Sequence, residues 1–103
     1  MLMAAREARR FAVSLTFPEF EQNRMAQLAI LKAVEVVGEA ASHVSDEVRA
    51  EHPEIPWSKI IGMRNRLVHG YFSVRLERVW DTVKQDIPRL ISQLEPLVPP
   101  EME

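Results

Sequence analysis

The sequence has no cysteine and only three glycines among its 103 residues. The lack of cysteine excludes disulfide bonds, thiolate nucleophiles and cysteine-ligated zinc sites. The glycines (Gly38, Gly62 and Gly70) are isolated, so the sequence contains no glycine-rich phosphate loop. Charged residues interrupt every apolar run before it reaches the roughly 18 residues that a membrane-spanning helix needs. The N-terminal residues also lack the apolar core of a signal peptide. We therefore expect a soluble, cytoplasmic protein.

The length of the chain indicates a single domain, since typical domains have on the order of 100–150 residues. Hydrophobic residues make up 47% of the sequence and charged residues 27%, which is close to the average for folded proteins. A chain of this size buries only roughly 60–70% of its unfolded surface, so oligomerisation would stabilise it. We expect one helical domain over residues 1–96 and a flexible tail over residues 97–103.

Apolar residues recur at intervals of three and four rather than in alternation, which predicts an all-α protein. The expected architecture is an up-and-down antiparallel bundle of four main helices and one short helix. Thr16 and Glu19 match a capping box, with Leu15 and Phe20 placed as a hydrophobic staple. The predicted helices cover residues 2–14, a long segment from this box to about 43, a short segment 46–50, then 57–69 and 74–94.

Helix ends and buried faces follow from the same pattern. Ser45 and Ser73 are expected N-caps, Gly70 is an expected stop, and Pro88 is expected to kink the last helix. The residues predicted to face inward are Ala8, Phe11, Ala12 and Leu15, then Ile30, Val34, Val37, Ala41 and Val44, and finally Leu76, Val79, Trp80, Val83, Ile87, Leu90, Ile91 and Leu94.

Charge is distributed unevenly, although the net charge is only −2. Residues 59–78 have a net charge of +4, and residues 35–58 have a net charge of −5. Arginines suit a polyanion because the guanidinium group forms paired hydrogen bonds with phosphate oxygens. We expect Lys59, Arg66, Arg75 and Arg78 to bind RNA. The alternative is that these residues form a solvated face or neutralise the acidic segment within the fold.

The segment from Met63 to Tyr71 contains the residue types needed for phosphodiester cleavage. An imidazole group titrates near neutrality in general, so the His69 side chain is of a type that can accept or donate a proton. Arg64 can stabilise the additional negative charge of a phosphorane-like transition state. Asn65 can orient His69 or a phosphate. We therefore predict Arg64, Asn65 and His69 as catalytic residues, although a histidine at a helix C-terminus can also simply cap carbonyl groups.

Metal-dependent catalysis lacks a recognisable motif, since the sequence has no His-Glu-x-x-His or Asp-x-Asp pair. His43 and His52 are isolated and are interpreted as surface residues. We expect no metal and no cofactor.

The spacing of Arg64 and His69 constrains the geometry of the site. On a regular helix, residues five apart are rotated by about 140° and separated by roughly 7.5 Å along the axis. The two side chains therefore share a face only if the helix ends between them. RNA cleavage by the 2′-hydroxyl group needs both a base and an acid, and a two-fold dimer supplies two histidines. We predict a homodimer with a shared active site.

These residues resemble the HEPN superfamily, and within it the HepT-like toxins that pair with MntA-type minimal nucleotidyltransferases. Arg64, His69 and Tyr71 match the family pattern Arg-x4-His-x-Tyr. The resemblance extends to further segments of the chain, namely Val36 to Ala41, Ile55 to Trp57, Ile60 to Asn65 and Asp86 to Leu90.

The resemblance implies a metal-independent, dimeric ribonuclease toxin of a toxin–antitoxin system with tRNA among its candidate substrates. Arg64 and His69 would be catalytic, and Asn65 would support them. It also implies a nucleotidyltransferase antitoxin that transfers AMP to Tyr71. An added anionic group near His69 would repel RNA. Alternatively, Tyr71 is an ordinary packed aromatic residue, and the chain is a non-catalytic binding subunit of a nucleotidyltransferase.

Overall fold

The structure is a computed structural model that describes residues 1–69 and 75–98, without the side chain of His69. All the regular elements in these residues are helical, which confirms the all-α class. In chain order they are α1 (Leu2–Ala12), α2 (Phe17–Gln22), α3 (Arg24–Ser42), α4 (Asp46–Glu51), α5 (Trp57–His69), α6 (Leu76–Asp81), the π-helical segment η2 (Thr82–Asp86), α7 (Ile87–Leu94) and the 3₁₀ turn η3 (Glu95–Leu97).

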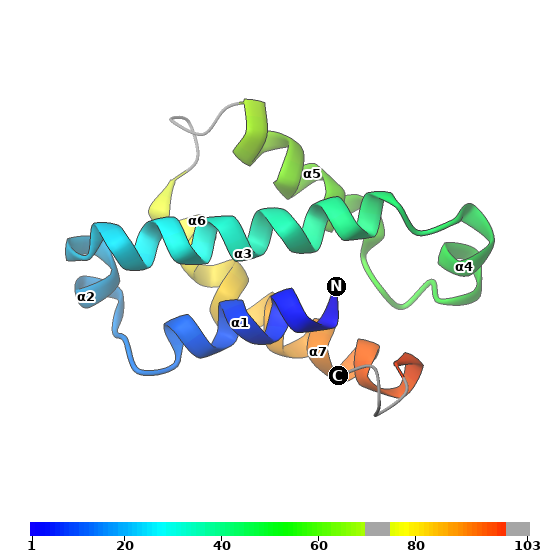
Figure 1. Cartoon of the computed structure of the whole chain (residues 1–103), viewed down its shortest axis with the longest axis horizontal. Helices are drawn as coiled ribbons and strands as arrows, with labels where there is room; N and C mark the ends of the chain where they lie inside the picture. Colours follow the sequence, from blue (N-terminus) through cyan, green and yellow to red (C-terminus); the bar gives the residue numbers. More distant parts are fainter. Residues whose placement is uncertain (70–74, 99–103) are drawn as a thin grey trace.

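The long helical segments alternate in direction, as expected for an up-and-down bundle (Figure 1). Helix α3 packs against both α1 and α5, and α1 packs against α7. The short helices α2 and α4 lie at opposite ends of α3 (Figure 1). Helix α3 is therefore the central support of the bundle, and α5 is held mainly by its contact with α3.

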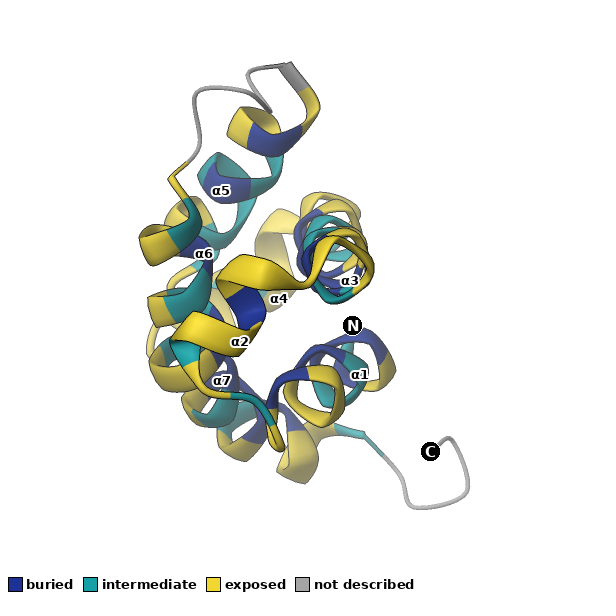
Figure 2. Cartoon of the chain, turned by 90° about the vertical axis from the view of Figure 1, so that its left-hand side faces the viewer, coloured by how far each residue is buried: buried dark blue, intermediate teal, exposed yellow. Residues whose placement is uncertain are grey.

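The predicted apolar face of α3 forms part of the core. Ile30, Val34, Val37 and Ala41 are all at most 5% exposed, and only Val44 is left half-buried. Buried residues of the other helices face the same interior (Figure 2). This arrangement follows from the spacing of three and four, which places these side chains on one side of a helix.

Helix α1 differs from its prediction at its C-terminal end. It ends at Ala12 rather than Ser14, and the Phe11 side chain is exposed rather than inward. The buried residues of α1 are Leu2 and four alanines (Ala4, Ala5, Ala8 and Ala12). Phe11 is rotated by about 75° around the helix axis from the middle of the stripe that these alanines form, so its side chain lies at the edge of the core.

The predicted long second helix is wrong, because the structure divides it into α2 and α3 at Asn23. The capping box is confirmed: the Thr16 N–H group donates to Glu19 Oε1 at 2.9 Å, and the Glu19 N–H group donates to Thr16 Oγ1 at 3.4 Å. The Thr16 N–H group, and also the Thr16 hydroxyl group at 3.0 Å, donate to the Glu19 carboxylate and lower the pKa of Glu19. Asn23 then starts a new helix by accepting the Ala26 N–H group at 2.9 Å.

Polar side chains close the other helix junctions. Buried Gln27 donates to the carbonyl oxygens of Phe20 at 3.0 Å and Glu21 at 2.9 Å, at the end of α2. The predicted cap at Ser45 is confirmed, since its Oγ accepts the Val48 N–H group at 3.2 Å. In α4, Arg49 donates to the last carbonyl groups of α3, on Ala41 and Ser42.

The last helical segment is described from Leu76 onward, so the predicted cap at Ser73 lies outside the described residues. Pro88 is expected to kink the last helix, and the structure has the π-helical segment η2 just before it. In a π-helix each N–H group bonds to the carbonyl group five residues earlier, rather than four as in an α-helix. Pro88 has no N–H group for the carbonyl of Lys84, and the preceding Ile87 N–H group bonds to Thr82 instead.

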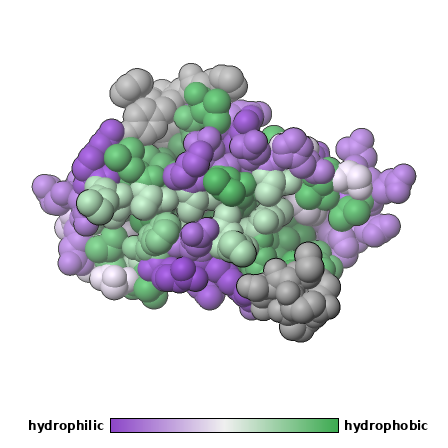
Figure 3. All heavy atoms as spheres, in the orientation of Figure 1, coloured by the Kyte–Doolittle hydropathy of each residue, from purple (hydrophilic) through white to green (hydrophobic). Residues whose placement is uncertain are grey.

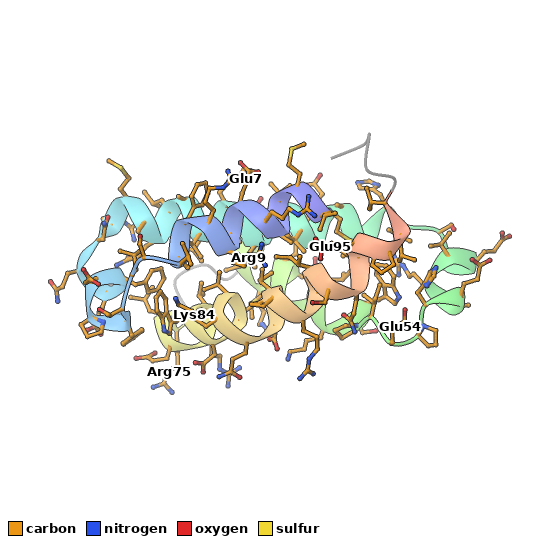
Figure 4. All side chains as sticks on the ribbon, turned by 90° about the horizontal axis from the view of Figure 1, so that it is seen from below. Glu7, Arg9, Glu54, Arg75, Lys84 and Glu95 are labelled. Atoms are coloured by element: carbon orange, nitrogen blue, oxygen red, sulfur yellow. The ribbon has the colours of Figure 1, made fainter. Side chains whose placement is uncertain are left out.

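Two side chains join the last segment to α1 (Figure 4). Lys84 Nζ donates to the carbonyl oxygen of Ala12 at 2.9 Å and lies 4.7 Å from the centre of the Trp80 ring. Near the other end, Arg6 and Glu95 form an ion pair at 2.7 Å. Of the predicted tail, residues 99–103 lie outside the described residues. None of the described helices combines the length and apolar content that crossing a membrane requires.

Candidate active site

Helix α5 holds the predicted catalytic segment at its C-terminal end. Pro56 precedes its first residue, and the Trp57 indole N–H group donates to the carbonyl oxygen of His52 at 3.0 Å, which fixes the entry of the chain. Met63 and Leu67 are 8% and 6% exposed and anchor one side of the helix in the core. The positions between these two residues are therefore placed around the edge and the outer side of α5.

Arg64 lies at the boundary between core and surface. Its side chain is half-buried, and Nη1 donates to Asn65 Oδ1 at 3.2 Å. Its Nε atom is buried and has no hydrogen-bond acceptor within the described part of the chain. The guanidinium group is thus supported by its neighbour on one side while retaining donors for another group.

Asn65 is exposed, and its described contact is with Arg64. This contact differs from the predicted role of Asn65, which is to orient His69 or a phosphate. Its predicted relation to His69 stays a prediction, because the His69 side chain lies outside the described residues.

The backbone of α5 remains helical through His69. The helix therefore does not end between Arg64 and His69, and the two positions are rotated by about 140° around the axis. A single copy of α5 directs these positions to different sides of the helix. Gly70 and Tyr71 lie outside the described residues, so the predicted helix stop and modification site stay predictions.

The four residues predicted to bind RNA fall into two groups. Lys59 pairs with Asp86 of η2 at 3.1 Å, and Arg75 lies 3.6 Å from Glu77 (Figure 4 shows Arg75 at the start of the last helical segment). Arg66 and Arg78 are exposed, and the described ion pairs include neither of them. Arg66 and Arg78 are therefore the better placed of the four to meet a phosphate backbone.

The acidic segment is not the partner of this basic segment in the described ion pairs. Glu35 pairs with Lys32 at 3.7 Å, and Glu54 lies 3.5 Å from His52 Nδ1. Within residues 1–69 and 75–98, no ion pair joins the acidic segment 35–58 to the basic segment 59–78. The explanation that the arginines neutralise the acidic segment inside the fold is therefore unsupported.

The other two histidines occupy helix ends, where His43 is exposed, as expected for a surface residue, and His52 is half-buried. His43 is exposed at the end of α3, and His52 follows α4. In the part of the chain that the structure describes, no three histidine or acidic side chains are grouped as a metal site would require.

The structure adds one residue that sequence reasoning did not assign to the site. Gly38 of α3 is buried where α3 meets α5, directly against the first carbons of the Arg64 side chain. The signals in the sequence were a glycine within a predicted helix and its place in the segment Val36 to Ala41 that resembles the family.

Comparisons with known proteins agree on one family. The family model described as "Ribonuclease HepT-like" matches residues 1–97. The chain belongs to the ribonuclease HepT-like family. This membership places it in the HEPN superfamily and supports an endoribonuclease.

Curated relatives cover most of the HepT-like chain. A protein of Thermococcus cleftensis named "Probable ribonuclease HepT" is 38% identical over 87 residues, covering 84% of this chain and 79% of the relative. A candidate RNase of Methanocaldococcus jannaschii is 32% identical over 95 residues, covering 92% and 87%. A candidate RNase of Caldanaerobacter subterraneus is 32% identical over 84 residues, covering 82% and 75%. No solved structure matches the chain.

Proposed function

We propose that this HepT-like chain is a metal-independent endoribonuclease toxin that acts as a homodimer. The observation that supports this most directly is the placement of Arg64, Asn65 and His69 within two turns at the end of one helix. Arg64 is already supported there by Asn65 and by the α3 helix. An arginine held at a surface is suited to stabilising charge that develops on a phosphate during reaction.

The proposed reaction is an internal attack by the RNA itself. One His69 accepts the proton of the ribose 2′-hydroxyl group as the O2′–P bond forms. The P–O5′ bond breaks, and a second histidine donates a proton to the leaving O5′ atom. The products are a 2′,3′-cyclic phosphate and a 5′-hydroxyl end, and Arg64 stabilises the additional negative charge between these steps.

The need for two histidines supports a dimer with a shared site. The catalytic segment contains one histidine, so the second proton carrier would be His69 of a second copy. Surface composition is consistent with association, because Met25, Leu28 and Val36 are 81%, 48% and 39% exposed on α3. Apolar side chains form a band across the face made by α1 and α3 (Figure 3).

The test of this function is cleavage of RNA by the purified protein in excess EDTA. Cleavage is expected to continue at an unchanged rate, because both proton transfers use imidazole groups rather than metal-bound water. The new ends are expected to be a 2′,3′-cyclic phosphate and a 5′-hydroxyl group, identified by mass spectrometry. Loss of cleavage in EDTA would show that the reaction depends on a metal ion. No cleavage of any RNA, tRNA included, would favour a binding subunit instead.

The proposed partner is a nucleotidyltransferase antitoxin that modifies Tyr71. The Tyr71 hydroxyl oxygen would attack the α-phosphate of ATP, with loss of its proton and release of pyrophosphate. The attached AMP lies two residues from His69 and adds a bulky negative group where RNA phosphate must bind.

Mass spectrometry of the protein co-expressed with its genomic neighbour tests this modification. One adenylate group per chain is expected on Tyr71, and a Tyr71→Phe protein should remain unmodified because it lacks the acceptor oxygen. An inhibited complex with intact Tyr71 would show that the antitoxin acts by covering the site.

A further inference from the structure

Helices α3 and α5 are in close contact at Gly38. A Cβ atom built on Gly38 would lie 2.2 Å from Arg64 Cβ, 2.9 Å from Arg64 Cγ and 3.1 Å from the carbonyl oxygen of Ile60. Carbon atoms in van der Waals contact are about 3.5–4.0 Å apart. Any side chain at position 38 would therefore force this turn of α5 away from α3 by more than about 1 Å.

Backbone conformation does not explain this glycine. Gly38 lies inside the regular helix α3, and no glycine in the described residues has a positive φ angle. Alanine favours a helix more than glycine does, so local propensity argues against glycine here. The feature that requires glycine is the space occupied by Arg64.

The contact acts on the part of Arg64 that determines the direction of its guanidinium group. Gly38 meets Cβ and Cγ, while the next polar atom, Nε, is buried and Nη1 is held by Asn65. Because α3 confines the Cβ and Cγ atoms of Arg64, the packing of the two helices determines the direction in which the guanidinium group points.

We propose that Gly38 is a positioning residue for Arg64. Its missing side chain allows α5 to pack on α3 at the distance that holds the Arg64 guanidinium group toward the scissile phosphate. This inference rests on the proposed ribonuclease function, although the contact between the two residues does not.

The first test compares Gly38→Ala with Gly62→Ala in the full chain. Gly62 lies on α5 two residues before Arg64, and a Cβ atom there would meet nothing within 4 Å. Gly38→Ala is expected to lower kcat for RNA cleavage on the order of 100-fold, because a misplacement of about 1 Å has effects of this size. KM should change little, and Gly62→Ala should retain both constants. Equal kcat for Gly38→Ala and the wild type would overturn the inference.

A second comparison separates positioning from loss of stability. Val37→Ala removes buried methyl groups from the adjacent position of α3 and leaves a cavity without adding an atom against Arg64. This variant is expected to unfold at a lower temperature yet keep kcat at the assay temperature. A kcat for Val37→Ala as low as that of Gly38→Ala would show a general structural effect. A Gly38→Ala chain that does not fold would likewise overturn the specific role of Gly38.

A spectroscopic measurement tests the contact between Gly38 and Arg64 without relying on RNA cleavage. The buried Arg64 Nε–H group is expected to give a ¹H–¹⁵N signal, assigned by its absence in Arg64→Lys. This signal should shift in Gly38→Ala and stay in place in Gly62→Ala. If wild-type protein does not cleave RNA but the signal shifts as expected, the proposed function fails and the positioning contact stands. If wild-type protein cleaves RNA and the signal does not move, only the positioning role fails.

Discussion

A His69→Ala protein is expected to lose RNA cleavage by at least about 100-fold while remaining folded. General acid–base catalysis by one positioned side chain contributes typically 10²–10⁴-fold, and the shared site would lose both of its imidazole groups at once. Initial rates on a short labelled RNA measure the loss. Circular dichroism and sedimentation velocity measure helix content and the state of association, both of which should match the wild type.

His43→Ala is the matched control for this substitution. His43 is exposed at the end of α3, in a different part of the sequence from the catalytic segment. Its removal changes the same chemical group without affecting the proposed proton transfers, so cleavage should be retained. A His69→Ala protein that cleaves at the wild-type rate would remove the basis of the mechanism.

Mixed dimers distinguish a shared site from two independent sites. If each site needs His69 from both copies, only dimers with two wild-type chains cleave RNA. In a freely exchanging equal mixture of wild-type and His69→Ala chains, activity per chain would fall to about a quarter, whereas independent sites would leave about half. A proportional fall would show that one histidine is sufficient for each site.

The sequence predicts the helices well because their signals are local. The capping residues Thr16 and Ser45 and the buried stripe of α3 each depend on neighbours within a few residues, and all are found as expected. The break at Asn23 was also signalled locally, since Asn is a favoured N-cap. The apolar repeat that predicts the long helix begins only at Ile30, so it does not show where that helix starts.

Other features depend on contacts between distant segments. Lys84 donates to the carbonyl group of Ala12 at the end of α1, which lies 72 residues earlier in the sequence. Gln27 and Arg49 donate to the end of the preceding helix, a contact that the pattern within a single helix does not predict. The position of Gly38 against Arg64 is of the same kind. Periodicity identifies which side of a helix is buried, but it does not identify which residue of the neighbouring helix lies opposite.

Replacing the 2′-hydroxyl group by hydrogen at the scissile nucleotide is expected to abolish cleavage at that linkage. The proposed mechanism uses this hydroxyl group as the attacking atom, so the deoxy substrate lacks the nucleophile rather than merely binding more weakly. A single substitution in an otherwise unchanged RNA makes the comparison specific. Cleavage at the other linkages of the same molecule serves as the internal control.

The same deoxy RNA distinguishes an effect on RNA binding from an effect on the cleavage reaction. The Arg64, Arg66 and Arg78 guanidinium groups would meet phosphates, which the deoxy substitution leaves intact, so the affinity for RNA should stay within about a few-fold. The deoxy RNA should therefore compete with cleavable RNA at a concentration near its dissociation constant. Efficient cleavage at the deoxy linkage would instead require water or another external nucleophile, and His69 would then need a different role from deprotonating the ribose.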